Sequence, residues 1–203
     1  SLLTAIAVTA ALIDYAFKAQ AAAHFTGREE LVTFFATFYA IAGVFSFLLQ
    51  FILGPRVLER FGIGPVLAVL PVVIALGGVL GSFIVTLGTT AILRGAHAVL
   101  GNSLFRSAFE VLYAPVPAHA KRPTKTIIDV AADRVGDIIG GGIVLLLLAV
   151  APGLPNAVMV LLGAIVAVIA LLLVARLNRG YVEQLAGNLR SGSMSLADGD
   201  VLD

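Results

Sequence analysis

The chain has 203 residues, of which 60% are hydrophobic and 12% are charged, and its formal net charge is +1. A soluble domain averages about 45–50% apolar and about 25% charged residues, so the composition excludes an ordinary water-soluble globular domain. The sequence has no cysteine, which excludes disulfides and cysteine-based metal or redox sites. Its apolar residues form runs of about 20, the length of a helix that crosses a bilayer. We therefore expect an all-α membrane protein.

The apolar runs predict six transmembrane helices in one domain over residues 1–178. In chain order we expect them at about 1–22, 31–54, 63–83, 90–114, 126–150 and 156–176. The sequences GPRVLERFGIGP (54–65) and AHAKRPTK (118–125) are expected to be loops, and Pro115 is expected to stop the fourth helix, because proline cannot continue a helix interior. Residues 179–203 are expected to form a tail that starts as an amphipathic segment and continues as a linker.

Basic residues cluster after the second, fourth and sixth predicted helices, while the connections after the third and fifth carry no charge. The positive-inside rule places the basic side in the cytoplasm, so both ends of the chain are expected there. Six helices with this topology correspond to half of a twelve-helix transporter, or to a complete small membrane module. Because the sequence begins directly in an apolar run, we expect it to be part of a longer protein.

Several charged residues fall inside the predicted spans, where each costs about 2.5–3.5 kcal/mol to insert. In the first helix, Asp14 and Lys18 are four residues apart and can pair. Spacings of eight, four and four predict one polar stripe on the fourth helix, made of Arg94, Asn102, Arg106 and Glu110. Spacings of four predict a second stripe on the fifth helix, made of Lys125, Asp129, Asp133 and Asp137, with Arg134 on a neighbouring face.

Two interpretations of these charges remain open. One is ion pairing between packed helices, for example Arg106 with Glu110, or Arg134 with an aspartate. The other is a water-filled or ligand-filled solute path between two polar stripes, which we prefer for the set as a whole. His97 is either a lone packed histidine or part of a proton relay. The spacing of Gly136 and Gly140 predicts close helix packing, with a hinge as the alternative.

Three segments resemble a known family. They are IDYAFK in the first helix, SLFRSAFEVLYAPVP in the fourth and KTIIDVAADRVGDIIGGG in the fifth. In their acidic, basic and glycine positions they are similar to the C-terminal six-helix half of the nucleotide (ATP/ADP) translocases of plastids and intracellular bacteria, which are distant relatives of the major facilitator superfamily. The resemblance implies a major-facilitator-like half-bundle that pairs with an N-terminal six-helix half.

The resemblance also implies roles for individual residues. Asp14 and Lys18 would flank a central cavity, Arg106 and Glu110 would line it, and Lys125 and Asp129 would lie at its cytoplasmic mouth. The chain departs from the family at Asp137, where the nucleotide exchangers have a lysine that helps to hold the substrate's phosphates. It is closer to bacterial relatives in which the membrane domain is joined to cytoplasmic HEAT-repeat or cyclic-nucleotide-binding domains.

From these patterns we expect half of a secondary transporter that moves an organic anion, with a nucleotide among the candidates, by alternating access. The alternative is a transporter-fold sensor or anchor that signals to cytoplasmic domains. We expect no enzymatic activity, because no catalytic motif stands out, and no cofactor, metal or nucleic-acid partner. The expected location is the bacterial inner membrane, in contact with lipid and with the C-terminal tail in the cytoplasm.

Overall fold

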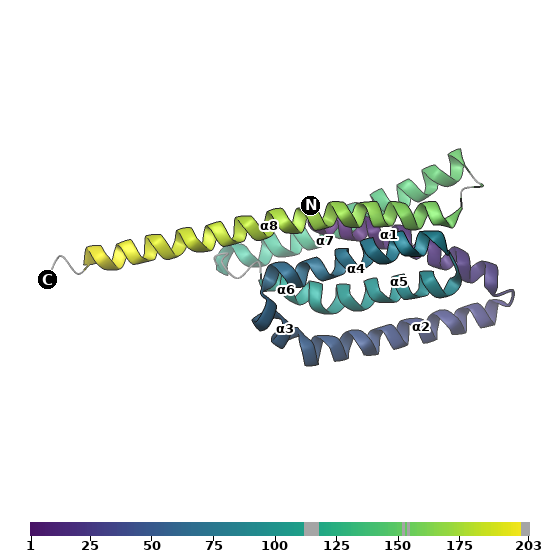
Figure 1. Ribbon diagram of the computed structural model, residues 1–203, viewed down its shortest axis with the longest axis horizontal. Coiled ribbons are helices and arrows are strands. Elements are labelled where there is room, and N and C mark those ends of the chain that lie inside the picture. Colours follow the sequence, from purple (N-terminus) through teal and green to yellow (C-terminus); the bar gives the residue numbers. More distant parts are fainter. Residues whose placement is uncertain (112–117, 152, 154, 200–203) are drawn as a thin grey trace.

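The computed structural model describes residues 1–111, 118–151, 153 and 155–199, with side chains described outside 53–55, 118–129 and 181–199. The regular structure of this part of the chain is entirely helical (Figure 1). Two short π-helical segments, named η, interrupt the α-helices. The elements in chain order are α1 (Leu2–His24), α2 (Arg28–Leu48), η1 (Leu49–Leu53), α3 (Gly54–Phe61), α4 (Ile63–Phe83), α5 (Leu87–Leu100), η2 (Gly101–Phe105), α6 (Arg106–Val111), α7 (Ala118–Val150) and α8 (Asn156–Gly199).

Four helices of the described chain are long and apolar enough to cross a membrane: Leu2–His24, Arg28–Ile52, Ile63–Phe83 and Asn156–Gly180. They agree closely with the first, second, third and sixth predicted spans. The predicted spans at 90–114 and 126–150 are helical where described but are not among the four, because charged and polar residues reduce their apolar character. An all-helical architecture of membrane-spanning type is therefore confirmed, whereas the count of six spans is not.

Helix α1 is the centre of the bundle. It packs against α7 and α8 and also contacts α5, while α4 packs along α8. The buried core is built where these helices meet, from apolar side chains spaced at helical intervals, among them Leu12, Ile13, Leu67, Leu70, Ile74, Met159 and Val160. Helix α2 lies at the edge of the bundle (Figure 1), and Ala42 and Ser46 are its buried residues. Phe34, Phe35 and Phe38 pack against Phe17 of α1, and apolar side chains such as Val44, Phe45 and Phe47 are exposed.

Glycines let α7 approach α1 closely. A Cβ added at Gly136 would collide with the side chain of Ala7 and would lie 2.9 Å from the carbonyl oxygen of Thr4. One added at Gly140 would lie 2.6 Å from the Cβ of Ala11. The predicted close packing at this glycine pair is therefore confirmed. Gly136 meets Ala7 and Gly140 meets Ala11, so the residue numbers rise in the same direction along both helices. Helices α1 and α7 are therefore parallel.

Three of the predicted loops or ends are wrong. Residues 54–61 form α3, in which Val57 and Leu58 pack against the core and the charged residues occupy the other face; the chain then turns at Gly62, whose φ is +77°. Residues 118–125 begin α7, because alanine, lysine and arginine all favour a helix. Helix α8 does not end at 176 but continues through Gly199, and its last part extends beyond the bundle alone (Figure 1).

Candidate functional site

Asp14 on α1 forms the main polar junction of the bundle. Its Oδ1 accepts hydrogen bonds from the Nε of Arg94 at 2.8 Å and from the hydroxyl of Tyr39 at 3.1 Å. Its Oδ2 lies 2.6 Å from the Nζ of Lys18, one helical turn later. The carboxylate therefore joins α1, α2 and α5. The predicted pairing of Asp14 with Lys18 is confirmed, and Arg94 and Tyr39 are partners that the sequence did not indicate.

The junction is partly withdrawn from solvent. The side chains of Asp14 and Arg94 are 21% and 19% exposed, whereas that of Lys18 is 57% exposed. The Arg94 guanidinium also lies over the ring of Tyr39, 5.6 Å from its centroid, in cation–π geometry. Arg94 thus has a carboxylate and an aromatic face as partners. A partly buried charge needs such partners, because an unpaired one loses its hydration without compensation.

Helix α5, which carries Arg94, begins with a capping box. Thr86 caps the helix by accepting a hydrogen bond from the backbone N–H of Thr89, and Thr89 Oγ1 accepts one from the backbone N–H of Thr86 at 2.9 Å. This capping box satisfies backbone donors that the first helical turn leaves unpaired. Leu93 faces the core and is buried, and the adjacent residue Arg94 faces α1 and α2.

A groove of about 450 Å³ lies beside this junction. Residues from α1, α2, α5, η2, α6 and α7 line it, so that it draws on most of the elements around α1. Its floor is apolar, and its polar lining consists of Tyr39, Arg94, His97, Asn102, Arg106, Glu110, Asp133 and Asp137. The groove thus combines an apolar surface with both signs of charge, as sites for charged organic molecules commonly do.

The structure brings together six of the predicted site residues in this groove: Arg94, Asn102, Arg106, Glu110, Asp133 and Asp137. Asp14 adjoins the groove through its contact with Arg94, and Lys18 adjoins it through its contact with Asp14. Arg134 pairs with Asp137, which lines the groove. Lys125 and Asp129 belong to α7, but their side chains lie outside the described part of the structure. Pro115 and Pro117 also lie outside it.

The two predicted polar stripes do not face each other directly. Helix α1 contacts both α5 and α7, and its residues Leu3, Ile6, Ala7 and Ala10 form the floor between the stripes. α5 runs antiparallel to α1, because Arg94 meets Asp14 while Asn102, further along α5, lines the groove with Leu3. The groove therefore follows α1 from its middle toward its N-terminal end. One end is near Arg94 and His97, and the other is near Arg106, Glu110 and Asp133.

Both ion pairs that the sequence suggested are present. The Nε of Arg106 lies 4.0 Å from Oε1 of Glu110, and Nη1 of Arg134 lies 3.8 Å from Oδ2 of Asp137. All four side chains are more than half exposed, and exposed pairs of this kind contribute about 0–1 kcal/mol. They place charge at the groove and should contribute little to stability.

His97 is a groove residue of a different kind. It is 8% exposed, and its Nε2 is a buried polar atom without a hydrogen-bond partner among the described residues. Such an atom costs about 1–3 kcal/mol and is uncommon in folded proteins. From the sequence, His97 is either a lone packed histidine or part of a proton relay, and Tyr39 is not singled out. No spacing rule within one helix distinguishes either residue, because the groups around them belong to other helices.

Within the described residues, no group of three or more histidine, aspartate or glutamate side chains could hold a metal ion. The fold and the groove define a helical bundle of membrane-spanning type with a charged groove along its central helix. No family model matches the chain, and no curated protein and no solved structure is found to be similar to it. The function of the chain is therefore inferred from the groove.

Proposed function

We propose that the chain is half of a secondary transporter, with a major-facilitator-like six-helix arrangement, and that it moves a charged organic solute by alternating access along the groove beside α1. The observation that supports this proposal best is the buried Nε2 of His97, which has no hydrogen-bond partner among the described residues, at the wall of a groove lined by charges of both signs. A solute that supplies a hydrogen bond there would offset the cost of the unpaired atom.

The weak ion pairs support movement as well as binding. Alternating access requires contacts that break and re-form at low cost, and the exposed Arg106–Glu110 and Arg134–Asp137 pairs meet this requirement. The Asp14–Arg94 contact is shorter and less exposed, and we assign it to holding α1 and α5 together. The segment η2 adjoins the same groove, and π-helical turns frequently occur at functional sites.

For the solute we propose an organic anion of low charge. Among the described side chains, the lining contains the cations Arg94 and Arg106 and the carboxylates Glu110, Asp133 and Asp137. This balance disfavours a polyanion such as a nucleoside triphosphate, since each added phosphate charge would also approach a carboxylate. A nucleotide, which the resemblance to the ATP/ADP translocases suggests, therefore remains a candidate of lower rank.

Uptake into proteoliposomes tests the proposal. A panel of labelled organic anions and nucleotides would be assayed with the unaltered protein and with Arg106→Ala and Asn102→Ala. Loss of a hydrogen bond to a charged group, about 1.5–3 kcal/mol, should reduce uptake of a transported solute roughly 10-fold to 100-fold. The control is Arg60→Ala on α3, whose side chain lies over Phe61 outside the groove. Equal uptake by all variants would exclude the groove as the path.

A second candidate function is a membrane sensor built on the same fold. The observation that favours it is the continuation of α8 through Gly199 as one unbroken helix beyond its apolar span, because a rigid helix can transmit movement out of a bundle. Thermal unfolding with the same solute panel distinguishes the two functions. Stabilisation by a solute that shows no flux in proteoliposomes favours the sensor, whereas stabilisation together with flux favours the transporter.

A further inference from the structure

A second pocket lies on α8, at the end of its apolar span. Arg176 and Arg179 line it together with Ile169, Leu172 and Leu173, and its volume is about 390 Å³. The spacings of three and four place these residues along one side of the helix. The span itself is Asn156–Gly180, so both guanidinium groups lie in its last turns, where a helix leaves the hydrocarbon and enters the headgroup region.

These two arginines differ from those of the groove. Arg94, Arg106 and Arg134 each pair with a carboxylate. Neither Arg176 nor Arg179 forms an ion pair with any side chain that the structure describes, and both are exposed. Two positive charges three residues apart on a helix repel each other, and an anion between them relieves the repulsion. The pocket thus has a positive rim with no counter-charge among the described side chains.

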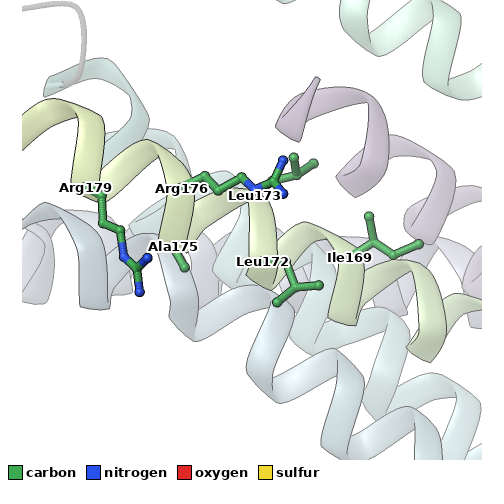
Figure 2. A pocket seen from close by; sticks show the side chains of 6 residues that line it. All are labelled: Ile169, Leu172, Leu173, Ala175, Arg176 and Arg179. Atoms are coloured by element: carbon green, nitrogen blue, oxygen red, sulfur yellow. The ribbon is translucent and has the colours of Figure 1, made fainter.

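The apolar part of the pocket leads directly into the membrane span. Ile169 and Leu172 are 49% and 61% exposed. In Figure 2, both arginine side chains extend back along α8, Arg176 toward Leu173 and Arg179 toward Ala175. This side of α8 therefore has the guanidinium groups of Arg176 and Arg179 at one end. One and two turns further into the membrane span it has the exposed aliphatic side chains of Leu172 and Ile169.

We propose that this side of α8 binds an anionic phospholipid. Its phosphate lies against Arg176 and Arg179, and an acyl chain follows Leu172 and Ile169. Guanidinium groups bind phosphate oxygens with strong, directional hydrogen bonds, and basic side chains beside a membrane span attract anionic headgroups. A free phosphate ion would satisfy the arginines but would leave the apolar strip without a role. The site is independent of the solute groove.

Native mass spectrometry and thermal unfolding of the protein in nanodiscs test the site, with phosphatidylglycerol titrated into phosphatidylcholine. We expect bound phosphatidylglycerol and a midpoint that rises with its fraction. At about 1 kcal/mol for each basic residue, Arg176→Ala or Arg179→Ala should weaken lipid binding about 5-fold, and the double variant roughly 30-fold. The matched control is Arg28→Ala, which removes an arginine that also forms no ion pair with a described residue, at the start of α2.

The double variant Arg176→Lys, Arg179→Lys preserves charge and tests whether the alanine variants merely fold poorly. It should retain most of the lipid binding. An equal effect of Arg28→Ala would overturn the site, because it would show a general charge effect. So would stabilisation by inorganic phosphate in detergent equal to that by the lipid, or unchanged lipid binding in the double alanine variant.

Discussion

Asp14 and Arg94 are 80 residues apart in the sequence, and their side chains meet at 2.8 Å between Oδ1 and Nε. This contact joins the first helix of the bundle to the helix that carries the groove's polar stripe. It is shorter and less exposed than the ion pairs at Glu110 and Asp137. It should therefore be a larger contributor to stability than either of them.

The substitution Asp14→Asn should destabilise the protein by about 1–3 kcal/mol, because Arg94 and Lys18 would lose the negative charge that offsets their partial burial. Thermal unfolding in detergent measures the effect. The double variant Asp14→Asn, Arg94→Gln should recover part of the loss, since it leaves no uncompensated arginine. The matched control is Asp137→Asn at the exposed pair with Arg134, for which we expect about 1 kcal/mol or less. Equal losses at the two sites would contradict the assignment.

Tyr39 has two contacts at this junction that substitutions can separate. Tyr39→Phe removes the hydrogen bond to Asp14 but keeps the ring under Arg94, and should cost about 0.5–1.5 kcal/mol. Tyr39→Leu also removes the ring and should cost about 0.5–1 kcal/mol more. The same unfolding assay measures both. If the two variants were indistinguishable, the aromatic face would have no part in holding Arg94.

The glycines of α7 provide an internal comparison. Gly136→Ala should destabilise the bundle by about 1–3 kcal/mol, because the added methyl group overpacks the contact with Ala7 and Thr4. Gly141→Ala is the control: nothing lies within 4 Å of the added Cβ, and a helix-interior alanine gains about 0.5–1 kcal/mol over glycine. The two substitutions should therefore shift the unfolding midpoint in opposite directions. A gain of similar size from both would show that α1 and α7 are not in close contact at Gly136.

His97→Leu should separate stability from function. It replaces an unpartnered buried polar atom with an apolar group, so the unfolding midpoint should stay the same or rise. If the groove binds a solute at Nε2, the same variant should lose solute-induced stabilisation and uptake. A variant that lost stability but kept full uptake would show that His97 is a structural residue whose partner is elsewhere.

Much of the fold could be predicted because it depends on runs of apolar residues. The helix at 63–83 has the predicted bounds, and the close approach at Gly136 and Gly140 followed from their spacing. The charges of the segment 118–125 predict a loop, whereas the structure has the start of α7 there. Charged residues indicate that a segment is exposed to water or to lipid headgroups. An exposed segment can be helical as well as irregular.

The grouping of some polar residues could be predicted, but their full arrangement could not. The cost of burying charge singled out Arg94, Arg106 and Asp137, and these residues line one groove. Spacing also predicted the partners of Arg106 and Asp137, which lie on the same helix, but not those of Arg94, which lie on other helices. Tyr39 and Asp14 meet through the packing of α1, α2 and α5, and no periodicity within any one of these helices encodes that contact.

The π-helical turn Gly101–Phe105 sets the direction in which the groove's outer charges point. A π-turn acts as one extra residue inserted into an α-helix, and each residue of an α-helix turns the chain by about 100°. A continuous α-helix over the same residues would therefore rotate α6 about its own axis by about 100° from its observed orientation relative to α5. Arg106 and Glu110 would leave the groove while Arg94 and His97 stayed in place. The charge distribution of the groove thus depends on the length of one helical turn as much as on the residues that carry the charge.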